Sequence, residues 1–175
     1  RLALTTLWVD LPTRGRQSLY AQLFLTRAIL KDDPIFDHPL GQYLRAPGIA
    51  LKAHASAVQA ALGLTADEAA LILADGNTGD EADSAKAALS LANVSLLYRY
   101  RFLAKALKVS VAELIDLKTL SGLDPFKPLH TGLLTSLEDD HAFGQTLAFV
   151  RNVQAVKSGQ LAVADDAGPD DAQFE

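Results

Sequence analysis

The sequence predicts an all-α fold, an irregular multi-helix bundle of capped helical hairpins joined by long loops. Hydrophobic residues make up 49% of the 175 residues and aromatic residues only 7%. The strong helix formers Ala and Leu dominate the composition. Three segments, which begin at Thr65, Ser110 and Thr135, also have the Ser/Thr-x-x-Glu form of a capping box, a pattern typical of helix N-termini.

The length of the chain allows one domain with its own hydrophobic core. We therefore expect residues 1–160 to form a single all-α domain. Residues 161–175 are rich in Ala and Asp and show no apolar periodicity, so we expect an acidic, flexible, solvated tail there. The chain begins at Arg1 and contains no Met. We interpret it as a fragment of a much larger protein.

Composition also argues against several classes of function. The net charge is -5, from 16 basic and 21 acidic residues, whereas a nucleic-acid or anionic-membrane surface needs a basic stripe. No apolar run approaches the roughly 20 residues of a membrane span, and no signal-peptide pattern is visible. The absence of Cys excludes disulfides, thiolate metal sites and thiol nucleophiles.

The first third of the chain predicts one helix between two irregular segments. Residues 1–9 either close a preceding helix or form a short strand, and residues 10–15 form a turn. Residues 17–30 show a helical apolar pattern with Ser18 as the N-cap. Residues 31–48 contain three Pro and two Gly and predict a loop. We expect five apolar residues to anchor this loop: Ile35, Phe36, Leu40, Tyr43 and Leu44.

The next segment predicts a helix, a corner and a second helix. The face of residues 50–62 carries Leu51, Ala55, Val58 and Leu62, and Gly63 is positioned to end the helix. The Thr65 capping box then begins a short helix that ends near residue 73. Residues 75–83, with two Gly and four acidic residues, predict an exposed loop.

Residues 90–126 hold the longest helical pattern, which begins with Ser90 as its N-cap. Its expected apolar stripe is Leu91, Val94, Leu97, Tyr98, Phe102 and Leu107. Within that stripe we expect Leu97 and Phe102 to be core residues, and we expect Arg99 and Arg101 to lie on a solvated or ion-paired face. The Ser110 capping box begins a further helix. We expect this helix to bury Leu114, Leu117 and Leu120 and to end at Gly122.

The last predicted helix spans residues 136–157 and follows the Thr135 capping box. Its stop signal is Gly159. The expected buried stripe is Leu137, Phe143, Leu147, Val150, Val153 and Val156.

Two of the helix–helix junctions align at an offset of 45 positions. Residues 61–68 and residues 106–113 both contain a helix end, a two-residue turn with one apolar residue, and a capping box. The apolar residues, Leu64 and Val109, are placed to pack against the following helix as a hydrophobic staple. The similarity is compatible with a chance likeness between junctions or with a duplicated helical hairpin.

No constellation of residues in the sequence predicts catalysis, a cofactor or a metal site. The four histidines, His38, His54, His130 and His141, lack the spacing of a zinc motif. Glu138 and His141 share a helical face, but helix capping explains acidic residues in a first turn better than a metal does. Residues 75–80 resemble a calcium loop only faintly, because an EF-hand needs Gly at its sixth position and Asp80 stands there.

The remaining candidate residues have simpler structural explanations. Asp32 and Asp33 precede Pro34 and predict a turn. Trp8 is interpreted as a core or interface anchor in preference to a ligand platform. Phosphate-binding Gly-rich motifs and a nucleophile elbow are absent, and no Ser is placed beside a His base. We therefore predict that the catalytic, cofactor-binding and metal-binding sets are all empty and that the protein is not an enzyme.

Residues 89–126 read LSLANVSLLYRYRFLAKALKVSVAELIDLKTLSGLDPF. This stretch resembles the helical region of the A subunit of insecticidal toxin complexes, also called the virulence plasmid A protein family. Residues 18–25 are similar to that family's Ser-Leu-Tyr-x-x-Leu-Phe-Leu segment, and Asp33-Pro34-Ile35-Phe36 follows at a similar distance. The segment 61–65, with His54 before it, also matches. Residues 137–159 resemble the family's next helix, which ends in a Ser-Gly pair.

The chain departs from the family pattern at two places. Thr26 stands where the family usually has Asn. After Ser158-Gly159 the family continues into another capped helix, whereas this chain continues with Gln160-Leu161-Ala162-Val163 and an acidic segment. The C-terminal end is therefore expected to be divergent or truncated relative to the family.

The resemblance implies a non-catalytic segment of the helical shell around a translocation channel. In the family, the A subunit is a homopentamer that binds the target cell, inserts at a pH change and passes a toxic payload. The implied partners are other A protomers, the B and C subunits and a host cell-surface receptor, and the implied location is secreted or extracellular. The alternative is a free-standing helical module that binds a receptor or another protein partner. A small helical enzyme or metal protein is the least favoured reading.

Overall fold

The structure is a computed structural model that describes residues 5–45, 48–127 and 141–159, and these residues confirm the predicted all-α class. The seven α-helices in these ranges are α2 (Leu19–Phe24), α3 (Arg27–Asp32), α4 (Ala55–Leu62), α5 (Ala66–Gly76), α6 (Leu91–Leu107), α7 (Val111–Ser121) and α8 (His141–Lys157). Three short 3-10 turns accompany them: η1 (Pro34–Phe36), η2 (Leu51–His54) and η3 (Gly79–Ala82). Within the same ranges, extended pairing is limited to one isolated bridge, between Ala50 and Ala88.

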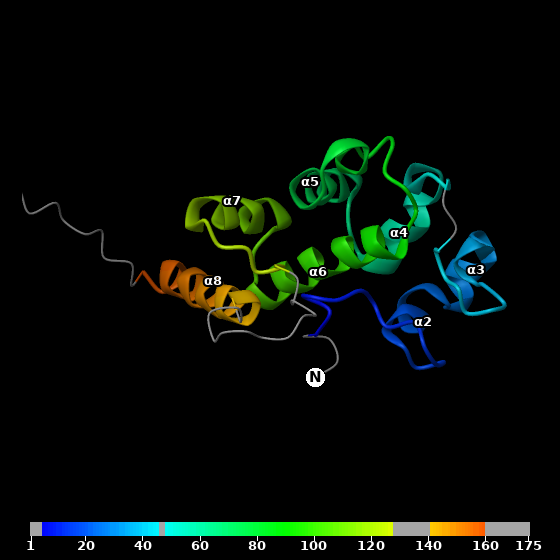
Figure 1. Cartoon of the computed structure of the whole chain (residues 1–175), viewed down its shortest axis with the longest axis horizontal. Helices are drawn as coiled ribbons and strands as arrows, with labels where there is room; N and C mark the ends of the chain where they lie inside the picture. Colours follow the sequence, from blue (N-terminus) through cyan, green and yellow to red (C-terminus); the bar gives the residue numbers. More distant parts are fainter. Residues whose placement is uncertain (1–4, 46–47, 128–140, 160–175) are drawn as a thin grey trace, which may run out of the picture.

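Helix α6 is the element around which the other helices pack. It contains 17 residues and is in contact with α4, α5, α7 and α8. Figure 1 shows α6 running through the middle of the molecule, with α2 and α3 at one end and α7 and α8 at the other. Five of its hydrophobic side chains are fully or almost fully buried in the core: Val94, Leu97, Tyr100, Leu103 and Ala104.

The two residues predicted to lie in the core from α6 differ in burial. Leu97 is 0% exposed, which confirms the prediction. Phe102 is half-buried at the edge of the core, where its ring stacks on that of Tyr98 at a centroid distance of 5.9 Å.

The corners that join α4 to α5 and α6 to α7 have the same backbone design. Gly63 ends α4 in the left-handed region, with φ 65° and ψ 40°. Lys108 ends α6 in the same region, with φ 55° and ψ 46°. The next N–H in each corner, that of Leu64 or Val109, donates to a carbonyl five residues back, at 3.1 and 3.0 Å. This is the bond that defines a Schellman motif, so the similarity seen in the sequence extends to the backbone.

Both corners continue into the predicted capping boxes. The Thr65 and Ser110 hydroxyls accept hydrogen bonds from the backbone N–H of Glu68 and Glu113, whose carboxylates accept in return from the N-cap N–H. The axes of η2–α4 and α5 turn by 103° at the first corner. The junction is therefore a helical corner rather than a tight antiparallel hairpin.

The prediction of a single helix over residues 17–30 is wrong. Ser18 caps α2 as predicted, but α2 ends at Phe24 and α3 begins at Arg27. The break follows from Thr26, whose hydroxyl accepts a hydrogen bond from the Ile29 N–H and so starts a new helix.

The loop after α3 is anchored by fewer apolar residues than predicted. Phe36 is fully buried, stacked on Phe24 at 5.0 Å, and Tyr43 and Leu44 pack against the core. Ile35 is exposed and Leu40 is 78% exposed, so these two predicted anchors are wrong. The helix predicted over 50–62 begins as a 3-10 turn and becomes α-helical at Ala55.

The buried faces of α7 and α8 also differ from the prediction. Leu114 is buried and Leu117 half-buried, but Leu120 is 84% exposed. In α8, Val153 is buried and Val150 half-buried as expected. However, Leu147 and Val156 are exposed, and Thr146 and Phe149 occupy the buried face in their place.

Several other predictions are settled only in part. The left-handed backbones of Gly122 and Gly159 confirm the predicted helix stops. Thr5 is helical and residues 6–8 form a turn, so the strand alternative is wrong for this part of the N-terminal segment. The Thr135 capping box, Leu137, the side chain of Phe143 and residues 161–175 lie outside the described residues, and the boundary of the predicted single domain stays a prediction.

Candidate functional site

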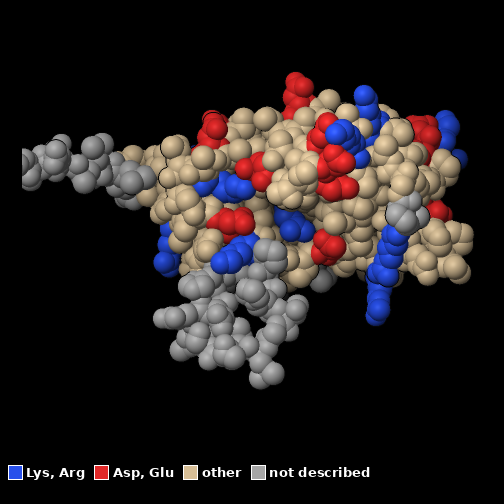
Figure 2. All heavy atoms as spheres, turned by 45° about the horizontal axis from the view of Figure 1, so that its top comes forward, with Lys and Arg blue, Asp and Glu red and all other residues tan. Residues whose placement is uncertain are grey.

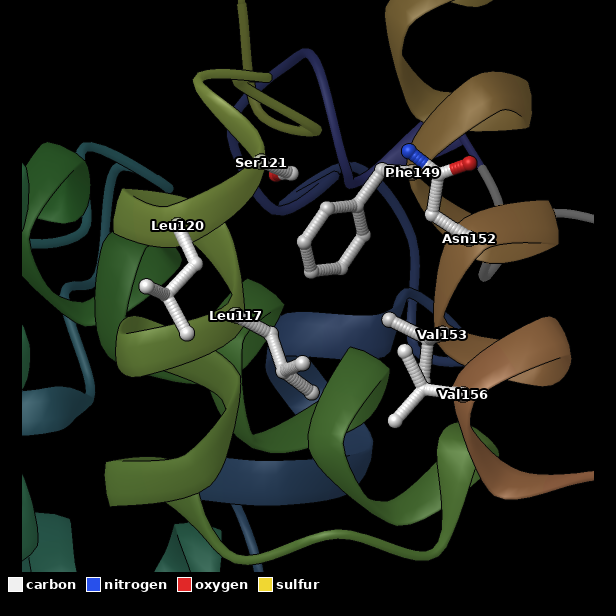
Figure 3. Close-up of a pocket in the computed structure, with 7 residues that line it drawn as sticks. All are labelled: Leu117, Leu120, Ser121, Phe149, Asn152, Val153 and Val156. Atoms are coloured by element: carbon white, nitrogen blue, oxygen red, sulfur yellow. The ribbon is translucent and has the colours of Figure 1, made fainter. Parts of the chain in front are cut away.

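An apolar groove lies between α7 and α8. Its volume is about 370 Å³. Leu117, Leu120 and Ser121 line it from α7, and Phe149, Asn152, Val153 and Val156 line it from α8. Figure 3 shows the α7 leucines facing the α8 valines across the gap. We call this feature the α7–α8 groove.

The floor and the rim of this groove differ in exposure. Phe149 and Val153 at the floor are almost completely buried, whereas Leu120 is 84% and Val156 48% exposed. Isolated exposed leucines are common in proteins, but an exposed pair lining one groove marks a surface suited to a second apolar element. The mainly apolar lining of the groove suits the apolar face of a helix.

One end of the groove is fixed by polar contacts between α8 and the preceding corner. The Lys157 Nζ donates to the carbonyl oxygens of Leu107 and Lys108, each at 2.9 Å. These carbonyls belong to the last turn of α6, where a cation is favoured by the helix dipole. The contact places the end of α8 beside the end of α6.

Near the C-terminal end of α7, a three-residue polar cluster joins α5, α6 and α7. The Tyr100 hydroxyl donates to Asp75 Oδ2 at 2.5 Å, and Lys118 Nζ contacts both the Tyr100 hydroxyl, at 3.1 Å, and the Asp75 carboxylate. The Asp75 and Lys118 side chains are each 18% exposed. Phe126 closes the cluster by stacking on the Tyr100 ring at 4.1 Å.

The electrostatics of this cluster indicate a structural clamp. Burial, followed by the hydrogen bond and charge of Asp75, raises the pKa of Tyr100 well above its ordinary value. The phenol therefore stays protonated and cannot act as a base at neutral pH. Each polar group is satisfied by another member of the cluster, and this arrangement holds three helices together.

The placement of Asp75 corrects the sequence interpretation. We predicted an exposed loop over residues 75–83, but Asp75 lies in the last turn of α5 and points into the clamp. The faint calcium-loop pattern is not assembled either, because Asp75 pairs with Lys118 and Asp80 with Lys86. Among the described residues, no group of three or more His, Cys, Asp or Glu side chains could hold a metal ion.

The rest of that loop is held by a hydrogen-bond network that the sequence pattern did not predict. Glu81 Oε2 accepts from the Asn93 side-chain amide at 2.6 Å and from the Ala88 N–H at 3.0 Å. Asn77 donates to Asn93 Oδ1 at 3.0 Å. Asn93 is almost fully buried. The sequence signal for this network was the position of Asn93, three residues after the Ser90 N-cap.

Arg99 is another residue whose environment differs from the prediction. Its side chain is 11% exposed and pairs with Asp10 at 3.4 Å, while Nε donates to the Ser95 carbonyl. Desolvation lowers the pKa of Arg99, and the charge of Asp10 opposes this shift. The predicted solvated face is therefore wrong for Arg99, although the ion-paired alternative holds. On the face drawn in Figure 2, acidic and basic side chains are interspersed rather than segregated.

Two predicted candidate residues have ordinary structural roles. The Trp8 ring packs against the core and its Nε1 donates to Thr146 Oγ1 at 3.0 Å, which confirms the anchor interpretation. His54 Nδ1 lies 2.6 Å from Asp33 Oδ2, and this pair ties η1 to the start of α4.

The other histidines show no assembled site. His38 accepts a local bond from the Leu40 N–H. His130, Glu138 and the side chain of His141 lie outside the described residues. Of the His and acidic residues that the sequence offered as candidate ligands, only His54 and Asp33 are in contact with each other in the described part of the chain.

Comparison with known proteins gives no relative: no family model, no curated protein and no solved structure matches this chain. In the described residues, no single helix is long and apolar enough to cross a membrane. The bent pair of residues 51–62 and 66–76 reaches that length and composition when its two arms are taken together.

Proposed function

We propose that this chain is a non-catalytic segment of the helical shell of a toxin-complex A subunit, the pore-forming, cell-binding component that translocates a toxic payload. The proposal rests on the sequence resemblance, whose landmarks occur in the same order along the chain. It is compatible with the all-α architecture, in which capped helical corners pack side by side around α6.

The structural observation that supports the proposal is the open α7–α8 groove. In the family, the chain continues beyond the Ser-Gly pair into another capped helix. Ser158 and Gly159 stand directly after α8, which forms one wall of the groove. A following helix of a longer polypeptide could therefore cover Leu120 and Val156. Full burial of such a side chain would contribute about 1.5–3 kcal/mol.

The proposed partners and location follow from the same family. They are other A protomers in a homopentamer, the B and C subunits, and a host cell-surface receptor bound through the full-length protein. The complex would act outside the bacterial cell. We propose no nucleic-acid partner, since the chain is net acidic.

The test uses the natural polypeptide that contains this sequence. We expect a reading frame with well over a thousand further residues and a hydrophobic pore-forming segment. The purified protein should form five-fold particles in electron microscopy and should release dye from liposomes after a pH change. A reading frame that starts near Arg1 and stops near Glu175, or a large parent protein that stays monomeric and leaves liposomes intact, would contradict the proposal.

The second candidate is a free-standing helical module that binds a protein partner, and the exposed Leu120 also favours it. In that case a short natural polypeptide should be a stable monomer. It should bind an amphipathic helix through the α7–α8 groove, with an affinity that Leu120→Ala weakens. A parent protein that assembles into pentamers would exclude this candidate.

A further inference from the structure

A second groove, of about 430 Å³, lies where α6 packs beside α4 and α2. Leu23 lines it from α2, residues 60–63 line it from the end of α4, and Tyr98, Arg101, Phe102 and Lys105 line it from α6. The four α6 residues follow at i, i+3, i+4 and i+7 and therefore share one face of the helix. The stacked rings of Tyr98 and Phe102 give this face an aromatic wall. We call this feature the α6 cationic groove.

The cations of this groove have no partner among the described residues. Arg101 and Lys105 make no ion pair or hydrogen bond there. The lining residues include no Asp or Glu. The groove therefore presents two positive groups beside an aromatic surface, in a chain whose net charge is -5.

The end of α4 does not provide a hydrogen-bond acceptor for Arg101. The Arg101 guanidinium lies close to Gly63, since a Cβ at Gly63 would be 4.0 Å from it. A cation is favoured at a helix C-terminus. However, Arg101 takes no carbonyl of α4 as a hydrogen-bond acceptor. Among the described residues its donors have no acceptor, and a guanidinium can bind a carboxylate in a bidentate manner.

We propose that the α6 cationic groove binds the acidic segment of this same chain, residues 164–175. That segment has the sequence ADDAGPDDAQFE, with five acidic residues, no basic residue and one aromatic residue, Phe174. Its carboxylates complement Arg101 and Lys105, and the Phe174 ring complements the aromatic wall. We choose this segment as the occupant because its negative charge is complementary to the positive charge of Arg101 and Lys105.

The described geometry allows the segment to reach the groove. Lys157, near the end of α8, contacts the carbonyls of Leu107 and Lys108. Arg101 precedes Leu107 by six residues, or about 9 Å along the helix, and Lys105 is nearer. Residues 160–175 span up to about 50 Å when extended, which is longer than this axial distance.

The experiment exploits the absence of Cys from the chain. A spin label attached at Ala172→Cys leaves every charge in place, and paramagnetic broadening of backbone amide signals is then measured in the full chain. We expect selective broadening at Ala61, Gly63 and Phe102. The paired variant Arg101→Gln and Lys105→Gln should abolish this broadening.

Two controls separate the groove from general charge effects. The paired variant Lys31→Gln and Arg151→Gln changes the net charge equally at residues outside the groove, and it should keep the broadening. Raising the salt concentration from about 0.1 M to about 1 M shortens the Debye length from about 10 Å to about 3 Å, so the broadening should be lost. The salt measurement uses the chain without the groove substitutions, so it still tests the proposal if the groove variant is unstable.

Three results would overturn the proposal. The first is the absence of broadening at the groove in the full chain at low salt. The second is broadening that survives both the groove variant and high salt. The third is broadening that appears only when labelled and isotope-enriched copies are mixed, because the segment would then dock on a second copy.

Discussion

Lys108 at the end of α6 adopts the same left-handed backbone as Gly63 at the end of α4. A side chain in this region costs roughly 1–2 kcal/mol, whereas glycine adopts it readily. The sixth-to-first hydrogen bonds of Leu64 and Val109 are nevertheless equivalent in the two corners. The second corner therefore tolerates backbone strain that the first avoids.

This difference predicts opposite effects of substitution at the two corners. Lys108→Gly should raise the free energy of unfolding by about 0.5–1 kcal/mol, and Gly63→Ala should lower it by about 1 kcal/mol. Urea denaturation measures both. Ala106→Gly, at an exposed helical position of α6, is the control and should lower stability by about 0.5–1 kcal/mol. Destabilisation by Lys108→Gly would show that the lysine side chain is needed at the corner.

A pair of identical substitutions in neighbouring helices tests the core. Leu97→Ala in α6 removes a fully buried side chain and should cost about 2–5 kcal/mol in stability. Leu120→Ala in α7 removes an 84% exposed side chain and should change stability by less than about 0.5 kcal/mol. Phe102→Ala should fall between them because that ring is half-buried. Equal unfolding midpoints for the two leucine variants would mean that the buried faces are misassigned.

The buried tyrosines predict a loss of stability at alkaline pH. Burial raises the pKa of both Tyr20 and Tyr100 far above the ordinary value of about 10. Above pH 10 the unfolded chain releases the phenol protons and the folded chain retains them, so the unfolded state binds fewer protons. The stabilisation is therefore fully present below about pH 10 and is lost as the pH rises toward the folded pKa values.

The measurement is the urea midpoint from about pH 9 to about pH 11.5. Stability should fall with a slope that Tyr20→Phe and Tyr100→Phe each reduce, whatever their effect on stability at neutral pH. An unchanged slope in both variants would mean that these phenols ionise in the folded protein.

The sequence was most informative where a local hydrogen bond determines the structure. The N-cap of Ser18 and the boxes at Thr65 and Ser110 were read correctly because each contact lies within three residues. The break at Thr26 was missed although its signal is also local, because the apolar pattern of residues 17–30 continues across it.

The buried faces of α7 and α8 were misread because strict three-residue steps drift around a helix. At 3.6 residues per turn, Leu120 lies about 120° from Leu114, whereas Lys118 lies about 40° from it. The buried row of α7 therefore leads from Leu114 to Lys118, which enters the Asp75–Tyr100 clamp. In α8 the same drift separates Leu147 from Val153, and Phe149 takes the buried position. Which charged residues pair across helices depends on tertiary packing, which no local pattern encodes.

The α7–α8 groove gives the sharpest test of the proposed packing function. Leu120→Glu should leave the stability of this chain within about 0.5 kcal/mol of the original, because the side chain is exposed. In the parent protein the same substitution should reduce assembly strongly, since an unpaired charge would be buried beneath the covering element. The yield of assembled particles by size-exclusion chromatography and electron microscopy measures the effect.

Leu71→Glu is the matched control, because Leu71 in α5 is 45% exposed and does not line the groove. It introduces the same charge at a comparable apolar position and should leave assembly unchanged. Hydrogen exchange gives a second readout, in which α7 should be more protected in the parent protein than in this chain. If Leu120→Glu assembles as well as Leu71→Glu and α7 gains no protection, nothing covers the groove in the parent protein and the packing proposal fails.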